Sequence, residues 1–139
     1  MSDILTNLVF HHVAVITPDI EMTSTLYQKM GYNSSAIIED PIQDVQIILL
    51  SKDNHPLIEL IQPQKETSHG QSLLKKNGVT PYHFCYKTNS INETIKELKN
   101  LRFLQITAIN PCVAFIDHEV CFMFQKKMGI IELIAKKAQ

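Results

Sequence analysis

The chain has 139 residues, of which 45% are hydrophobic and 19% are charged, and this is enough material for a single domain spanning residues 1–139. Its 13 basic and 14 acidic residues give a formal net charge of −1, so there is no basic surplus to attract a nucleic acid. The N-terminal segment is acidic where a signal peptide is basic, and no apolar run is long enough to cross a membrane. We therefore expect a cytoplasmic protein that binds neither nucleic acid nor membrane.

The first half of the chain predicts the order strand, helix, strand, strand, strand. An apolar, β-branched run over residues 10–16 predicts the first strand. Thr17-Pro18 then predicts an N-cap and the first position of a helix that ends near Met30, with Gly31 as the left-handed residue behind it. The apolar stripe of this helix is expected to comprise Ile20, Tyr27 and Met30. Turn-forming residues separate three further strands, expected at 34–39, 45–51 and 57–62.

A polar linker over residues 63–80 separates this module from a second one with the same order of elements. The linker contains one short helix, expected at 71–77 between Ser68 and Gly78 as caps. After a strand at 82–87, the capping box Ser90-Ile91-Asn92-Glu93 predicts a second helix. Its apolar stripe is expected to comprise Ile91, Ile95, Leu98 and Leu101. The remaining strands are expected at 103–109, 112–116, 120–125 and 129–135.

Two pairs of matching segments, used as anchors for the alignment, indicate that the second module repeats the first. The letters Ile-Glu-Leu-Ile at 58–61 recur at 131–134, which is a shift of 73 positions. The run that contains His12 aligns with the run that contains His83 at a shift of 71 positions. Because both anchors fall at equivalent ends of equivalent units, we predict a duplicated βαβββ module. Module one covers about 8–62 and module two about 81–136.

The repeat places two histidines and two glutamates at matching positions. His12 and His83 lie in the first strand of each module, and Glu59 and Glu132 lie in the last, between apolar neighbours. Two buried carboxylates require a cation or a hydrogen-bond network, since an uncompensated buried charge is costly. Two imidazoles and two carboxylates form an N2O2 donor set suited to zinc, nickel, cobalt, manganese or iron. The sequence therefore predicts a divalent metal held by these four residues, with positions left for water or substrate.

A single histidine in an apolar strand is more often a hydrogen-bonded core residue than a metal ligand. A purely structural role fits any one of the four residues taken alone. For all four at matching positions of the repeat, that interpretation would need a separate explanation for the two buried carboxylates. His11 is the alternative to His12, because strand neighbours point to opposite faces, and the match with His83 selects His12. The remaining histidines are expected at the surface, in turns or in the linker: His55, His69 and His118.

Other chemistry finds little support in the sequence. Cys85, Cys112 and Cys121 are odd in number, form no CxxC pair and lie in apolar runs, so we expect buried thiols. No glycine-rich phosphate loop is present among the four glycines. The aromatic residues fall at spacings that core packing explains, and we assign none to an organic cofactor.

Three segments carry a family resemblance. Residues 10–15, Phe-His-His-Val-Ala-Val, are similar to the opening strand of the vicinal oxygen chelate superfamily, which includes glyoxalases, bleomycin-resistance proteins and dioxygenases. Residues 80–86 resemble the opening of its second half, and residues 129–134 its closing strand. The resemblance extends from about Leu8 to Lys136. It implies an α+β fold in which two tandem βαβββ modules form a U-shaped, half-barrel mixed sheet with a metal-binding cleft.

Within the superfamily, residues 59–63 and 110–115 resemble the methylmalonyl-CoA epimerase-like branch. This resemblance implies an isomerase that moves a proton next to a carbonyl, with a divalent metal as Lewis acid. Glu132 is the first candidate for the proton carrier and Glu59 the second. The implied substrate is a small molecule, an acyl-CoA thioester or a glutathione hemithioacetal, and we expect a homodimer.

Two departures from the family pattern keep other functions open. The epimerases carry a catalytic glutamate where this chain has Ile42, so a second acid–base group would have to be Asp44, Gln43 through water, or one mobile glutamate. Glyoxalase I-like lactoylglutathione lyases, an alternative assignment, close with a motif that this chain replaces with residues 126–129. A non-enzymatic resistance protein that binds a small molecule is a further alternative, although such members often lack the ligand set. An iron dioxygenase is a third possibility, but those enzymes usually carry more modules.

Overall fold

The computed structural model describes residues 3–138, which divide into two compact units. The first unit is His12–Tyr82, and the second unit combines residues 3–11 with residues 83–138. Strands β1 (Val9–Ile16) and β6 (Thr80–Lys87) contribute residues to both units. No helix in the described part of the chain is long and apolar enough to span a membrane.

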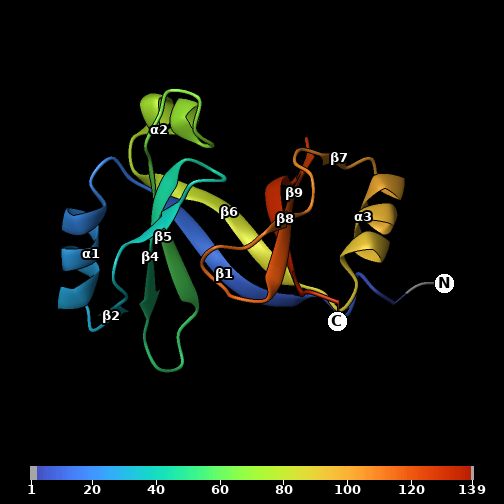
Figure 1. Ribbon diagram of the computed structural model, residues 1–139, viewed down its shortest axis with the longest axis horizontal. Coiled ribbons are helices and arrows are strands. Elements are labelled where there is room, and N and C mark those ends of the chain that lie inside the picture. The colour runs from blue at the N-terminus through green and yellow to red at the C-terminus, as the bar shows by residue number, and fades with distance from the viewer. Residues whose placement is uncertain (1–2, 139) are drawn as a thin grey trace. The chain divides into compact units, whose positions relative to one another are not determined.

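The first unit is a mixed sheet covered by one helix (Figure 1). Its strand order is β2 (Asn33–Ser34), β4 (Val45–Ser51), β5 (Leu57–Pro63) and β1, with β3 (Ile38–Asp40) also pairing with β4. Strand β5 is parallel to β1 and antiparallel to β4. Helix α1 (Ile20–Lys29) contacts β4 and β5. The core beneath it is aliphatic: Val15, Ile20, Ile48, Leu50, Ile58 and Leu60. The short helix α2 (Gln71–Asn77) precedes β6.

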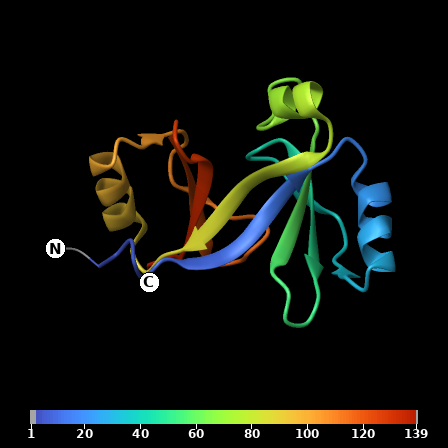
Figure 2. The same cartoon turned by 180° about the vertical axis from the view of Figure 1, so that it is seen from behind.

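The second unit repeats this plan with its own helix, which Figure 2 shows from behind. Its strand order is β6, β10 (Gly129–Lys136), β9 (His118–Gln125) and β7 (Leu104–Gln105), with β8 (Asn110–Pro111) also pairing with β9. Strand β10 is parallel to β6 and antiparallel to β9. Helix α3 (Ile91–Asn100) contacts β7, β9 and β10. The core lies between them: Ile91, Ile95, Leu98, Phe103, Cys121, Met123, Ile131, Leu133 and Ala135.

The strand register confirms the predicted repeat. In the first unit Ala14 of β1 is the partner of Glu59 in the parallel ladder, and in the second unit Cys85 of β6 is the partner of Glu132. Ala14 and Cys85 are 71 positions apart, and the two glutamates are 73 apart, as in the two sequence anchors. The α+β class and the duplicated βαβββ order are therefore both confirmed.

The helix starts also repeat, although the sequence analysis placed the first one wrongly. Thr17 was expected to be the N-cap of α1, but the cap is Asp19, whose carboxylate accepts the Met22 N–H at 3.0 Å. The Thr17 hydroxyl instead accepts the Asp19 N–H at 3.1 Å, so Pro18 lies before the helix. In the second unit Thr88 accepts the Ser90 N–H at 3.2 Å in the same way.

The predicted capping box of α3 is half confirmed. Ser90 is the N-cap and accepts the Glu93 N–H at 3.3 Å. Its own N–H is taken by Thr88 rather than by Glu93, because the threonine before the helix already provides that acceptor.

Three further local predictions were wrong: they concern the apolar stripes of the two long helices, the cap of α2 and two of the expected strands. Met30 and Leu101 are 61% and 53% exposed, so neither belongs to its helix stripe. The short helix α2 is capped by Gly70, and the Ser68 hydroxyl donates to the Asp44 carbonyl instead. The strand expected at 103–109 is reduced to the two-residue strand β7, and residues 112–116 form no strand, because the two-residue strand β8 lies just before them.

Candidate functional site

The first unit places His12 beside Glu59. His12 lies on β1 and Glu59 on β5, and they are 1% and 6% exposed. His12 is the ladder partner of Leu57, two positions before Glu59, so the two side chains lie on the same face. The His12 Nε2 atom is 3.6 Å from Glu59 Oε1. An imidazole and a carboxylate are therefore held together within the dry interior of this unit.

The second unit builds the same pair from the equivalent strands. His83 on β6 and Glu132 on β10 are each 4% exposed. The His83 Nε2 atom and Glu132 Oε1 are 3.0 Å apart, which is hydrogen-bond distance. Phe122 lies on β9 and is the ladder partner of Glu132. Its ring meets the His83 ring edge-on at a centroid distance of 5.0 Å. Phe122 therefore limits the rotation of this imidazole, and the sequence analysis had not assigned it that role.

The spacing within each pair suits a metal ion. Zinc and similar ions bind imidazole nitrogen and carboxylate oxygen at about 2.0–2.2 Å. Two such ligand atoms are therefore about 3.0 Å apart at a right angle and about 3.4 Å apart at the tetrahedral angle. The observed separations of 3.0 and 3.6 Å are close to these values. Each pair thus has the geometry of two ligands on one ion, without rearrangement of the strands.

The other histidines have different surroundings. His11 is half-buried, and its ring meets Phe115 edge-on at 4.8 Å. His55 is exposed as predicted, with Nδ1 at 2.7 Å from the Asp53 carbonyl. His69 and His118 were expected at the surface but are half-buried. The reason is local contact, since the His69 Nδ1 atom is 3.4 Å from the Tyr82 hydroxyl and His118 begins β9.

The cysteines are thiols, as predicted, and two of the three are buried. Cys85 and Cys121 are inside, whereas Cys112 is half-buried. Burial raises the pKa of the Cys121 thiol above its ordinary value, so this side chain remains a protonated core residue at neutral pH.

The last residue of β3 is a buried acid to which the sequence analysis assigned no role. Asp40 is 3% exposed, and its carboxylate accepts the Ile42 and Gln43 N–H groups at 2.9 and 3.1 Å. The Gln43 side-chain amide also donates to Asp40, at 3.0 Å. Asp44 forms an ion pair of 3.2 Å with Lys65. The Asx-type sequence Asp-Pro-Ile-Gln was the available signal, because aspartate commonly accepts N–H groups two and three residues ahead.

Comparison with known proteins finds methylmalonyl-CoA epimerases both among similar sequences and among similar structures. The model of the Glyoxalase/Bleomycin resistance protein/Dioxygenase superfamily matches residues 11–122. The ethylmalonyl-CoA/methylmalonyl-CoA epimerase of Cereibacter sphaeroides is 28% identical over 129 residues, covering 88% of this chain and 94% of that protein. The mitochondrial methylmalonyl-CoA epimerase of Mus musculus is 26% identical over 99 residues, covering 70% of this chain and 55% of that protein. The chain thus spans about half the length of the mouse relative.

Solved structures extend the similarity over nearly the whole fold. Methylmalonyl-CoA epimerase from Mycobacterium tuberculosis superposes with a TM-score of 0.82 at 17% identity, covering 94% of this chain and 89% of that chain. A methylmalonyl-CoA epimerase in complex with methylmalonyl-CoA and NH4+ gives 0.79 at 17% identity, covering 94% and 96%. At this identity the likeness shows a shared fold.

Proposed function

The chain belongs to the glyoxalase, bleomycin resistance protein and dioxygenase superfamily, and from this premise we propose that it is a metal-dependent epimerase that moves a proton beside the carbonyl of an acyl-CoA thioester. The observation that carries the proposal is the duplicated pair: a buried imidazole and a buried carboxylate at metal-ligand spacing in each unit. The similarity to an ethylmalonyl-CoA/methylmalonyl-CoA epimerase over 88% of the chain supports the substrate class.

In this proposal His12, Glu59, His83 and Glu132 hold one divalent ion together. The donor set fits, because two neutral imidazoles and two carboxylates satisfy the charge and the ligand preferences of zinc, nickel, cobalt, manganese or iron. The two carboxylates also gain the cation that their burial, 6% and 4% exposed, calls for. When bound, the ion would supply Lewis-acid stabilisation of the negative charge that develops on the thioester oxygen.

The chain's own carboxylates would carry the proton. Glu132 is the first candidate, as a buried carboxylate that the ion would hold loosely enough to be released and take the proton. Glu59 is the second candidate, at 3.6 Å from its histidine. Burial of both groups excludes competing water from the proton transfer.

A second acid–base group is harder to supply from the loop before β4. Ile42 is apolar and 46% exposed. Gln43 is engaged by Asp40, and Asp44 is paired with Lys65. We therefore favour one glutamate that serves both faces of the substrate carbon over a pair of dedicated groups.

We also expect the enzyme to be a cytoplasmic homodimer. Apolar side chains that remain exposed in the second unit support an interface: Val9 at 62%, Phe10 at 42% and Phe84 at 51%. The rings of Phe10 and Phe84 already meet edge-on at 5.9 Å, so together they form a compact aromatic patch suited to the centre of an interface.

The direct test of the function is proton exchange with solvent. The metal-loaded protein is incubated in D2O with methylmalonyl-CoA or ethylmalonyl-CoA, and deuterium at the carbon beside the thioester is followed by mass spectrometry. We expect exchange together with interconversion of the two epimers. Exchange with the hemithioacetal of glutathione instead would assign the lyase function. Saturable binding of these compounds without exchange would identify a small-molecule-binding protein and overturn the proposal.

A further inference from the structure

The second unit contains a pocket on the helix side, apart from the His83–Glu132 pair. It has a volume of about 400 Å³, which is within the range of small-molecule sites, roughly 300–1,000 Å³. One wall is the exposed flank of α3, and the other is the segment from Gln105 to Ile109. The residues that line it are Asn92, Ile95, Lys96, Lys99, Asn100, Gln105 and Ile109.

The charge of this lining is entirely positive. It contains two lysines, three side-chain amides, two isoleucines and no carboxylate. Lys96 and Lys99 are three positions apart, so they lie on the same stripe of α3. Within residues 3–138, neither lysine has a carboxylate within 4.0 Å in an ion pair. Within the described residues, two lysines with no carboxylate at ion-pair distance therefore line the same opening.

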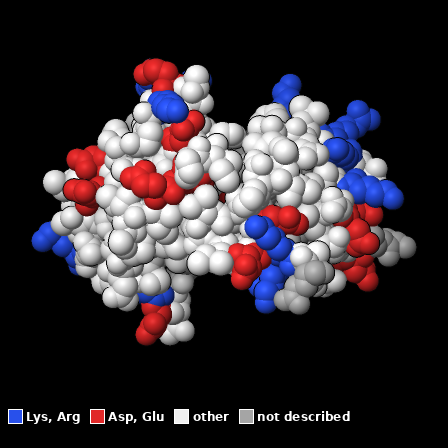
Figure 3. Space-filling model, viewed as in Figure 1, with Lys and Arg blue, Asp and Glu red and all other residues white. Residues whose placement is uncertain are grey.

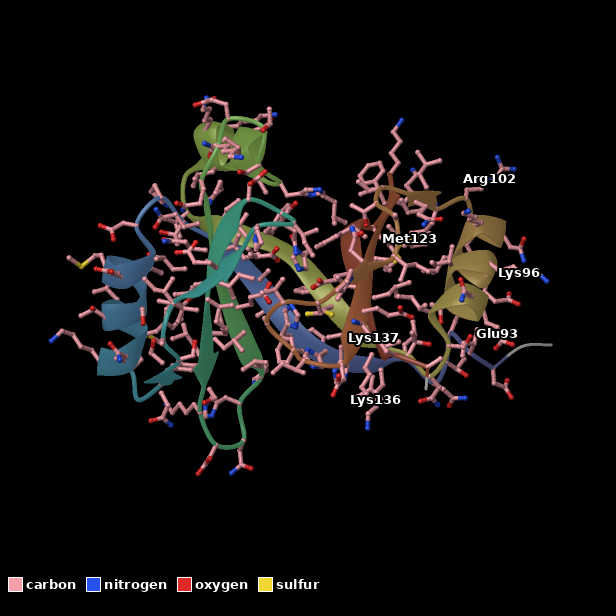
Figure 4. The ribbon with its side chains drawn as sticks, in the orientation of Figure 1. Glu93, Lys96, Arg102, Met123, Lys136 and Lys137 are labelled. Atoms are coloured by element: carbon pink, nitrogen blue, oxygen red, sulfur yellow. The ribbon has the colours of Figure 1, made fainter. Side chains whose placement is uncertain are left out.

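Two acidic residues of the helix lie near the pocket without lining it, and one of them, Glu93, is three positions before Lys96 on α3. Glu93 and Glu97 are four positions apart, and neither lines the pocket. Figure 4 shows Glu93 and Lys96 along the outer flank of α3, with Arg102 just beyond its end. In Figure 3 the surface over this helix carries basic groups beside acidic ones. The charged side chains of the lining itself are nevertheless both basic, although the chain as a whole has a net charge of −1.

The inner part of the pocket is apolar. Ile95 is 7% exposed and belongs to the core, and Ile109 packs against that core. Asn92, Asn100 and Gln105 also line the pocket, and the Gln105 amide donates to the Thr107 carbonyl at 2.9 Å. A ligand suited to this lining has an anionic group for the lysines and a flat or apolar part for the isoleucines. Its polar edge can exchange hydrogen bonds with the amides.

We propose that this pocket binds a phosphorylated nucleotide-type ligand, with its phosphate on Lys96 and Lys99 and its organic part on Ile95 and Ile109. Phosphate suits the two ammonium groups, because charge-assisted hydrogen bonds to phosphate are the strong ones. Two sources provide this chemistry: the nucleotide portion of a coenzyme A thioester, or a free nucleotide that acts independently of the reaction.

The test uses ADP and adenosine 3′,5′-bisphosphate as probes, titrated into the 139-residue chain and followed by backbone amide NMR shifts. We expect saturable shifts confined to residues 92–109. The double substitution Lys96→Gln and Lys99→Gln should weaken binding about tenfold or more. The matched control, Lys126→Gln with Lys127→Gln, removes the same charge from exposed residues outside the pocket and should bind as the unaltered chain does.

Absence of saturable shifts, or equal affinity in the double variant and the unaltered chain, would overturn the proposal. Steady-state kinetics of the double variant distinguish the two sources of the nucleotide. A raised KM for a coenzyme A thioester but not for the matching pantetheine thioester assigns the pocket to the substrate's nucleotide. An unchanged KM with weakened ADP binding assigns it to a separate nucleotide. Because the NMR titration requires neither metal nor turnover, its failure is distinct from failure of the proposed epimerase function.

Discussion

The two units keep the same strand ladder but pack their helices differently. Position 24 of α1 is a serine where the repeat-equivalent position 95 of α3 is an isoleucine. Ser24 is buried and donates a hydrogen bond of 2.8 Å to Ser34, whereas Ile95 contributes to an aliphatic core. The strands that carry the histidines and glutamates therefore retained their register after the duplication, while the helix contacts diverged. This difference indicates that the ladder is the part on which the site depends.

The two histidine–glutamate pairs allow the same comparison at the site itself. They occupy equivalent ladder positions, but the second pair is closer, at 3.0 Å against 3.6 Å. In the second pair the ring of Phe122 also meets the histidine edge-on. The repeat-equivalent position of Phe122 in β4 is filled by an aliphatic residue, Leu49, which is the ladder partner of Glu59. Two chemically identical pairs thus differ in their spacing and in the side chain that the neighbouring strand places opposite the glutamate.

The largest expected effect is on proton exchange when either carboxylate is neutralised. With saturating metal, Glu132→Gln should lower the deuterium-exchange rate by about 100- to 10,000-fold, since the variant loses its general base. Glu59→Gln should lower it less, because Glu59 is the second candidate for the proton. Exchange rates measured in the same D2O assay compare the two. Glu21→Gln, on the exposed side of α1, is the control, and a larger loss in Glu59→Gln would reverse the assignment.

A smaller effect is expected on the free energy of unfolding when equivalent buried residues of α1 and α3 are replaced by alanine. Ile95→Ala should lower the free energy of unfolding by about 2–5 kcal/mol, because it leaves a cavity in the aliphatic core. Ser24→Ala should cost only about 1 kcal/mol, the typical contribution of one hydrogen bond. Urea unfolding followed by circular dichroism measures both values. Equal losses in the two variants would contradict the difference in packing described above.

The smallest effect concerns the residue that follows each helix. Gly31 and Arg102 are repeat-equivalent and adopt φ values of +95° and +69°. Glycine has no steric penalty there, whereas an arginine is strained by about 1–2 kcal/mol. Arg102→Gly should therefore raise the free energy of unfolding by about 1 kcal/mol, and Gly31→Ala should lower it by a similar amount. A loss of stability in Arg102→Gly, measured by the same urea titration, would show that its side chain has another role.

The sequence contained enough information to predict the repeat and to select the four buried residues of the candidate site. The Ile-Glu-Leu-Ile copies and the matching histidine runs selected two histidines and two glutamates at equivalent positions. The structure adds the pairing within each unit, because the first and last strands of each module are parallel neighbours. The signal was strong because a glutamate within an apolar strand is costly to bury unless a partner compensates its charge.

The irregular segments were less predictable, because their conformation depends on partners far away in the chain. Residues 103–116 are rich in apolar and β-branched side chains, yet Leu104, Ile106 and Ile116 are 66%, 43% and 82% exposed. Strand propensity alone cannot supply a neighbouring strand. The role of the threonine before each helix was also not predicted correctly. Its hydroxyl accepts the N–H two positions ahead and lies 2.7 or 2.6 Å from the hydroxyl of a threonine within the helix, Thr23 or Thr94.

The central claim is that both units hold one and the same ion, and metal stoichiometry tests it most directly. Elemental analysis of the purified chain, of the double variant His12→Ala with Glu59→Gln, and of the double variant His83→Ala with Glu132→Gln gives the number of ions per chain. We expect one ion in the unaltered chain and none in either variant, provided that circular dichroism shows each variant to be folded. Two ions falling to one in each variant, or no ion in the unaltered chain, would contradict the shared site.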